Sequence, residues 1–207
     1  MPTPMSFDSF LTLAAPYLPF DGMNEKGVAM ALLAVPEAQI KKDESKITLN
    51  TTAAIRLVLD KAATVEEAVE LLSKYNIYFS GDIECHYLIA DATSKSVIVE
   101  YWDGGLQVVK PNEVYQIATN FIAYNGLNIG EGASEFERYD IVKQTIEENN
   151  KALTRQQTLD LLKEVGVYGT DGADKLQWSV VYNITDLRGY SFVHRNTENV
   201  IDFTLKK

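Results

Sequence analysis

The order of the predicted helices and strands constrains the fold of this chain more than any other feature of its sequence. A continuous apolar run, Lys26–Val35, stops at Pro36 and predicts a strand that is buried on both faces. Two helices follow it, then several strands, two more helices and a final group of strands. Because helices and strands come in blocks and do not alternate singly, we expect helix pairs on the outer faces of largely antiparallel sheets. The expected fold class is α+β, a layered sandwich.

Four amphipathic segments carry the helix signals. Asn50 or Thr51 is a capping residue for the first helix, because a short polar side chain there can accept a hydrogen bond from the first turn. Thr64 and Glu67 form a capping box that opens the second helix. Helical spacing of apolar residues predicts the other two helices over Glu135–Glu147 and Thr154–Val165.

Elsewhere the hydrophobic pattern has a period of two, which is typical of strands. Short apolar or alternating runs are joined by segments of turn composition, so they predict an antiparallel meander and a second group of strands after the last helix. The predicted strands are Cys85–Ala90, Ser96–Tyr101, Leu106–Val109 and Tyr115–Thr119, which ends at Asn120, followed by Trp178–Ile184, Tyr190–His194 and Val200–Leu205.

The charge balance excludes several classes of partner. The chain has 29 acidic and 19 basic residues, a net charge of −10, and neither sign forms a long run. Nucleic acids and anionic membrane surfaces both need a concentrated positive patch, so neither partner is expected. No run of about 18 apolar residues predicts a membrane-spanning helix, and the first residues lack the pattern of a signal peptide. We therefore expect a cytoplasmic protein.

Cysteine and histidine are too few to predict a metal site or an internal disulfide. The sequence has one cysteine, Cys85, and two histidines, without zinc-ligand spacing. Asp21, Asn24 and Glu25 are close together, but turn chemistry before a strand explains these residue types. No metal and no cofactor is expected.

Several segments together carry a resemblance to a known family. Asp21–Gly27 reads Asp-Gly-Met-Asn-Glu-Lys-Gly directly before the first predicted strand. Matching segments follow in order at His86–Asp91, Lys95–Glu100, Thr119–Asn120, Glu137–Tyr139 and the final strands. The chain resembles the choloylglycine hydrolase family, also called linear amide C–N hydrolases, which includes bile salt hydrolases and penicillin V acylases. We expect a single domain over residues 1–207, with an N-terminal segment (1–19) and a family-like region (20–207).

The resemblance implies the N-terminal-nucleophile hydrolase fold, a four-layer αββα sandwich, and an N-acyl amine as small-molecule substrate. In that family an N-terminal cysteine is the nucleophile and its own α-amine is the general base. Asn120 matches an asparagine whose amide would donate to the oxyanion. Arg138 matches an arginine whose charge would lower the pKa of the nucleophilic thiol. Phe121, Tyr124 and Phe136 lie closest to these positions and are candidates for an acyl pocket. Taken alone, such an Asn also serves as a turn former, and such an Arg as a surface ion-pair partner.

The sequence also departs from the family pattern. Residues 1–20 precede Asp21 and contain no cysteine, so we expect an N-terminally incomplete chain without the nucleophile. Cys85 does not replace it, because neighbouring strand residues such as Cys85 and His86 point to opposite faces. Ala34 stands near a position where the family has a substrate-facing polar or aromatic residue. Bile salts, penicillins, acyl-homoserine lactones and other N-acyl amines therefore all remain candidate substrates.

Three hypotheses stay open at this point. The chain is a truncated or split amide hydrolase, or a non-catalytic scaffold that binds a ligand or partner chain, or an enzyme shortened by a frameshift. Strands left unpaired and apolar surface left uncovered would favour pairing, so we expect a homo-oligomer or a complementing chain.

Overall fold

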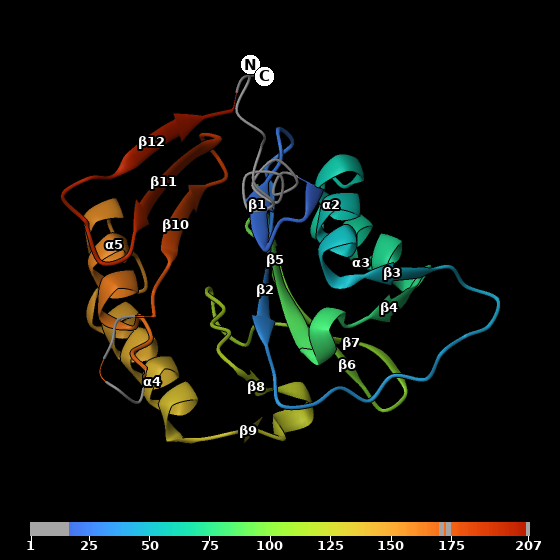
Figure 1. Cartoon of the computed structure of the whole chain (residues 1–207). Helices are drawn as coiled ribbons and strands as arrows, with labels where there is room; N and C mark the ends of the chain where they lie inside the picture. The colour runs from blue at the N-terminus through green and yellow to red at the C-terminus, as the bar shows by residue number, and fades with distance from the viewer. Residues whose placement is uncertain (1–16, 170–171, 173–174, 206–207) are drawn as a thin grey trace, which may run out of the picture.

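The chain folds into four layers of helices and sheets (Figure 1). The computed structural model describes residues 17–169, 172 and 175–205. Helices α2 (Thr51–Lys61) and α3 (Val65–Ser73) cover a five-stranded sheet, and α4 (Ala133–Glu148) and α5 (Arg155–Glu164) lie outside a three-stranded sheet. This order of layers confirms the α+β sandwich that the blocks predict.

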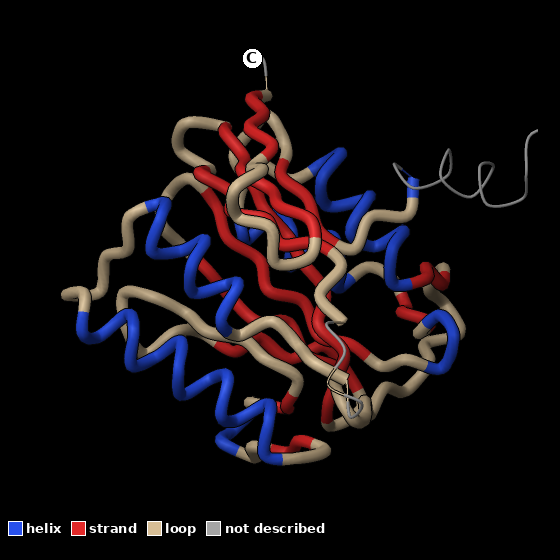
Figure 2. The backbone as a smooth tube through the Cα atoms, turned by 60° about the vertical axis from the view of Figure 1, so that its left-hand side comes forward, coloured by secondary structure: helices blue, strands red, loops and turns tan. Residues whose placement is uncertain are grey.

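The five-stranded sheet is antiparallel throughout and forms the centre of the molecule (Figure 2). Its strand order is β1-β2-β5-β6-β7. The expected meander is confirmed in this sheet. The strands span Asp21–Met23 (β1), Val28–Ala34 (β2), Cys85–Asp91 (β5), Ser96–Trp102 (β6) and Gly105–Val109 (β7).

The second sheet contains the three strands predicted after the last helix. These are β10 (Trp178–Asn183), β11 (Arg188–Val193) and β12 (Ile201–Thr204), all antiparallel. Leu159 of α5 packs on Tyr190 and Phe192 of β11, which fixes the helix on one face of this sheet. Short elements complete the chain: β3 (Thr48–Asn50), β4 (Asn76–Tyr78), β8 (Phe121–Ile122), β9 (Ile129–Gly130) and the 3₁₀ turns η2 (Ser80–Asp82) and η3 (Tyr124–Gly126).

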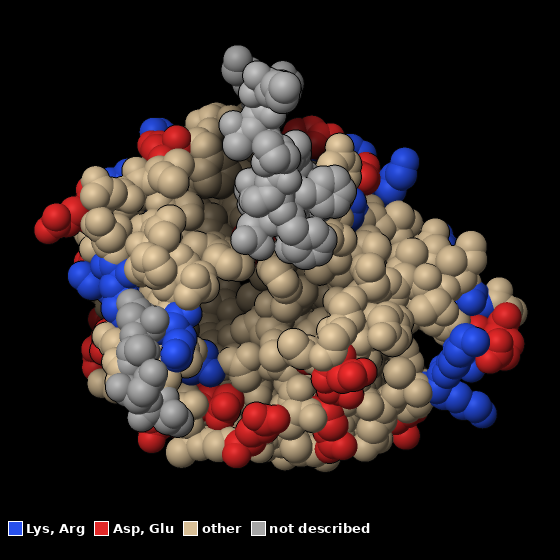
Figure 3. All heavy atoms as spheres, viewed as in Figure 1, with Lys and Arg blue, Asp and Glu red and all other residues tan. Residues whose placement is uncertain are grey.

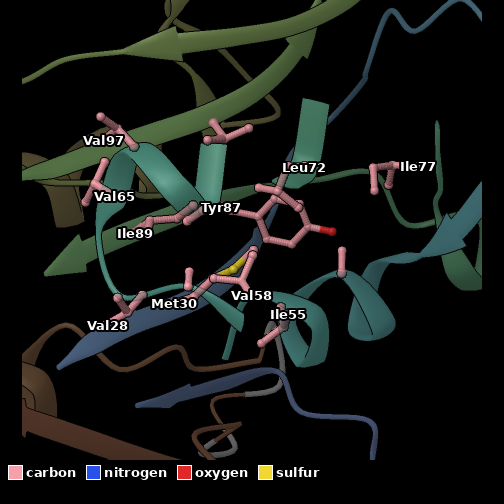
Figure 4. Packing of buried hydrophobic residues seen from close by; sticks show 14 of the residues in the cluster. Val28, Met30, Ile55, Val58, Val65, Leu72, Ile77, Tyr87, Ile89 and Val97 are labelled. Atoms are coloured by element: carbon pink, nitrogen blue, oxygen red, sulfur yellow. The ribbon is translucent and has the colours of Figure 1, made fainter. Parts of the chain in front are cut away.

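The main core lies between the five-stranded sheet and helices α2 and α3 (Figure 4). Tyr87 and Met30 project from the sheet and meet Val58 and Leu72 from the helices, all fully buried. Burial of the Met, Val and Leu side chains contributes about 1.5–3 kcal/mol each. Alternate residues of β2 face this core, while the intervening residues stay partly exposed, so β2 is not buried on both faces as its sequence predicts.

The predicted helix caps are present. The Asn50 side chain accepts a hydrogen bond from the Ala53 N–H (2.7 Å), and Thr64 accepts one from the Glu67 N–H. The Glu67 carboxylate accepts from the Ala63 N–H at 2.7 Å, one residue before the position that a standard capping box uses. Both helices therefore begin where short polar residues satisfy their first N–H groups.

The strand predicted over Tyr115–Thr119 is wrong. This segment is irregular, and the chain forms β8 only after Asn120, paired with β9. Side chains take the place of a strand ladder: Gln116 donates to the Val109 carbonyl (2.9 Å) and Thr119 donates to the Glu135 carbonyl (2.9 Å). Apolar alternation alone cannot separate such a segment from a strand, because it does not report where the backbone hydrogen bonds go.

Candidate functional site

Asn120 and Arg138, the two residues expected at the reacting centre, are in direct contact. Arg138 lies in the second turn of α4, and its Nη2 donates to Asn120 Oδ1 at 2.7 Å. Asn120 Nδ2 in turn donates to the Ala34 carbonyl at the end of β2 (2.8 Å). Because a guanidinium only donates, this contact fixes which end of the Asn120 carboxamide carries the oxygen. The second Nδ2 hydrogen has no acceptor among the described residues.

The charge of Arg138 is held in a half-buried position. Burial lowers the pKa of its guanidinium, and the carboxylate of Glu135 acts in the opposite direction. An arginine side chain stays protonated in proteins, so the group remains a fixed positive charge beside the Asn120 amide. Arg138 Nε also donates to the Ser134 carbonyl at 3.2 Å, which restricts its orientation.

The three candidate pocket residues do not gather at one place. Phe121 and Phe136 stack with ring centroids 4.8 Å apart, and both line a cavity of about 710 Å³. Tyr124 is not among the residues that line this cavity, and its side chain packs instead against the cluster of Val35, Trp102 and Ile122. Asn120 and Arg138 do not line this cavity either. An acyl pocket built by the three aromatic residues stays a prediction.

Cys85 lies in the main core and is 2% exposed. Burial raises the pKa of its thiol to about 12, with a smaller contribution from the charge of Glu84. His86 points to the opposite face of β5, where its Nδ1 lies 3.0 Å from Glu100 Oε1. The thiol is therefore protonated at neutral pH and has no histidine base beside it.

Glu100 is a buried charged residue that reasoning from the sequence missed. It is 0% exposed, and its carboxylate accepts hydrogen bonds from the backbone N–H groups of Ala123 (2.9 Å) and Tyr124 (2.8 Å). The signal was present in the meander, because the pairing of Tyr87 with Val99 places His86 opposite Glu100. Extending that register would have found the pair.

The Asp21–Gly27 segment has a structural role in the described residues. Asn24 is buried; its Oδ1 accepts from the N–H groups of Lys26 and Val28, and its Nδ2 donates to the Leu59 carbonyl of α2 and the Ala62 carbonyl directly after that helix. No group of three potential metal ligands occurs in the described part of the chain.

Asp21 joins the two sheets. Its carboxylate accepts hydrogen bonds from Trp178 Nε1 (3.1 Å) and the Tyr182 hydroxyl, both on β10. The surface between the two sheets is hollowed on the face shown in Figure 3, with acidic side chains along its lower edge. None of the described helices is long and apolar enough to cross a membrane.

The layers and strand directions define the class of protein: an N-terminal-nucleophile hydrolase fold. A variant of the conjugated bile acid hydrolase from Clostridium perfringens superimposes with a TM-score of 0.66 and 19% identity, over 90% of this chain and 72% of that one. Penicillin V acylase from Agrobacterium tumefaciens superimposes with a TM-score of 0.69 and 24% identity, over 89% and 65%. Residues 10–162 match the model of the linear amide C–N hydrolases, choloylglycine hydrolase family. The chain belongs to this family.

Sequence relatives point to the same family. Penicillin V acylase from Pectobacterium atrosepticum is 35% identical over 111 residues, which are 48% of this chain and 29% of that protein. Bile salt hydrolase/transferase from Clostridium perfringens is 35% identical over 115 residues, 51% of this chain and 33% of that protein. The matched region thus spans about a third of these curated relatives.

Proposed function

We propose that this chain forms the oxyanion-stabilising part of an amide hydrolase site. Asn120 would donate its second Nδ2 hydrogen to the oxygen that becomes negative when a nucleophile attacks an amide carbonyl. The observation that carries this proposal is the contact of Arg138 with Asn120, because it holds the Asn120 carboxamide with its donor end turned to the end of β2. The fixed charge of Arg138 would add to the attraction for the developing oxyanion.

The substrate that we propose is an N-acyl amine, in line with the penicillin V acylase and bile salt hydrolase relatives. Ala34 carries only a methyl group at the position whose carbonyl holds Asn120. A methyl group has no hydrogen-bond donor for a polar group on the substrate. The shape of the acyl chain would therefore decide affinity more than hydrogen bonding at this point.

We propose further that the 207-residue chain does not turn over amides by itself. Its single cysteine is buried in the core with a thiol pKa of about 12, so a thiolate nucleophile is not available at neutral pH. A nucleophile would have to come from another polypeptide segment. Assays with glycocholate and phenoxymethylpenicillin should give no turnover above buffer. Turnover by the wild type would overturn this point, and its loss in Cys85→Ala would identify Cys85 as the nucleophile.

Ligand binding tests the role of Asn120 without requiring turnover. Asn120→Ala should raise the Kd for phenoxymethylpenicillin or glycocholate about fivefold to tenfold, the effect of one lost hydrogen bond. Asn199→Ala is the matched control, because Asn199 is exposed in the loop before β12. If the wild type binds neither ligand, or if Asn120→Ala binds as tightly as the wild type, Asn120 is not part of a substrate site.

A second function fits the burial of the only thiol equally well: a scaffold that binds a ligand or a partner chain and performs no chemistry. Exposed apolar side chains such as Val114, Ile47 and Tyr78 favour association with another chain. Light scattering at several concentrations tests it, since a monomer at every concentration would remove self-association as an explanation. Ligand binding unchanged by Asn120→Ala would favour this scaffold over the hydrolase site.

A further inference from the structure

We propose that Glu100 is the residue that positions Asn120, acting through two backbone N–H groups of the segment that carries it, with His86 orienting the Glu100 carboxylate. This inference rests on the proposed role of Asn120 and adds the device that holds it. Glu100 does not touch Asn120, so it is a positioning residue and not a catalytic one.

The first observation is the double contact of the carboxylate. Glu100 Oε1 accepts from the Ala123 N–H at 2.9 Å, and Oε2 accepts from the Tyr124 N–H at 2.8 Å. Each oxygen thus holds one of two consecutive N–H groups, directly after β8 and at the start of η3. Such charge-assisted bonds are stronger than neutral ones, and a pair of them fixes both position and direction of the backbone.

The second observation is the partner of the carboxylate. His86 is 1% exposed, and its Nδ1 lies 3.0 Å from Glu100 Oε1. Since the carboxylate is an acceptor for three donors, Nδ1 must carry the proton in this contact. His86 Nε2 is buried and has no hydrogen-bond partner among the described residues. The proton on Nδ1 therefore faces the Glu100 carboxylate, and this contact fixes how the carboxylate is turned.

The third observation is how the chain is held on either side of β8. This strand has 2 residues and, among the described residues, pairs only with β9, which also has 2. Before β8, the Asn120 side chain donates to the Ala34 carbonyl and accepts from Arg138; after it, the backbone N–H groups donate to Glu100. The Ala34 and Glu100 contacts reach different strands of the same sheet, β2 and β6. Releasing the Glu100 anchor would let β8 move, and Asn120 would move with it.

A role in stability alone would also explain a buried, hydrogen-bonded glutamate, so the test must follow Asn120 itself. In Glu100→Gln the side chain keeps its shape, but its NH₂ group faces a backbone N–H and cannot accept from it. Hydrogen exchange of the amide that faces this NH₂ group, Ala123 or Tyr124, should then accelerate by about tenfold or more. The two side-chain NH₂ resonances of Asn120, followed by ¹⁵N NMR, should shift or broaden in the same variant.

A matched control and a conservative variant sharpen this experiment. Glu113→Gln removes an exposed carboxylate that pairs with Lys151 and should leave the Asn120 resonances unchanged. Glu100→Asp keeps the charge and both acceptor oxygens, so the Asn120 shift should be smaller and in the same direction. If Glu100→Gln accelerates exchange at neither amide, or leaves the Asn120 resonances where they are in the wild type, the proposal is wrong.

The wild type alone provides a test if Glu100→Gln does not fold. In low urea, solvent exchange of the Asn120 side-chain NH₂ and of the Ala123 and Tyr124 amides should rise with the same slope, because one local opening releases all three. Independent slopes would overturn the proposal. These measurements follow NMR resonances and need no ligand, so they test the positioning of Asn120 separately from the proposed function. The proposed function is wrong if Asn120→Ala binds ligand as tightly as the wild type.

Discussion

The Arg138 guanidinium donates through Nη2 to the Asn120 carboxamide oxygen at 2.7 Å, and so joins helix α4 to the segment before β8. The contact sets the Asn120 amide with its NH₂ group toward the Ala34 carbonyl. A charged donor therefore decides the orientation of a neutral side chain that could otherwise be turned by half a rotation.

Arg138→Lys should weaken this arrangement while keeping the charge. A lysine ammonium cannot reproduce the planar geometry of a guanidinium, so the Asn120 oxygen would lose its fixed donor. We expect a loss of about 1 kcal/mol in the free energy of unfolding, measured by urea titration, because the contact is half-buried. The Asn120 side-chain NMR resonances should move as well. Lys143→Arg on the same helix is the control, and an Arg138→Lys variant that matches the wild type in both measurements would show that the contact does not orient Asn120.

Asn24→Ala should be among the most destabilising changes outside the hydrophobic core. The Asn24 side chain accepts from two backbone N–H groups at the start of β2 and donates to the Leu59 and Ala62 carbonyls at the C-terminal end of α2. Alanine would leave these buried groups unpaired, at a cost of about 3 kcal/mol or more. Urea unfolding monitored by tryptophan fluorescence measures the loss. Asn199→Ala should change stability by less than about 0.5 kcal/mol, and equal effects of the two variants would contradict this account.

The raised pKa of Cys85 predicts a loss of stability in alkaline solution. The folded thiol has a pKa of about 12, above its usual value, so the unfolded chain releases this proton first as the pH rises. The unfolded state then binds fewer protons than the native state, and stability falls between about pH 9 and pH 12 by up to roughly 4 kcal/mol. Unfolding free energies at pH 8 to 11 measure this, and the slope should be smaller in Cys85→Ala. Identical slopes would show that the thiol titrates alike in both states.

Local signals predicted most of the fold. The caps at Asn50 and Thr64 act through side chains and N–H groups that are neighbours in sequence, so composition and spacing suffice to find them. The meander was equally readable, because β5, β6 and β7 are short, largely apolar runs joined by short turns. The segment Tyr115–Thr119 failed because its bonds go to Val109 and Glu135 through side chains, which periodicity does not report.

The candidate site was only partly predictable. Family resemblance identified Asn120 and Arg138 as candidates for the site. Their contact depends on how α4 packs near β8, which no local pattern encodes. Tyr124 was grouped with Phe121 and Phe136 by closeness in sequence, but η3 turns it toward Trp102. Glu100 was missed for a different reason: a charged residue in an apolar strand is usually exposed, although the register of β5 and β6 places this one opposite His86.

Gly189→Ala should destabilise the second sheet through a clash with a single ring. A Cβ at Gly189 would overlap Cζ of the Phe203 ring, and the two residues face each other across β11 and β12. The Phe203 ring must then leave its position beside Tyr182, which we expect to cost about 1–3 kcal/mol in the free energy of unfolding. Phe203→Leu removes the ring and should restore part of the stability to the double variant. A double-mutant cycle by urea unfolding measures this coupling. Strictly additive losses would show that Phe203 already yields to a methyl group, and that the absence of a side chain at Gly189 does not determine the packing of β12.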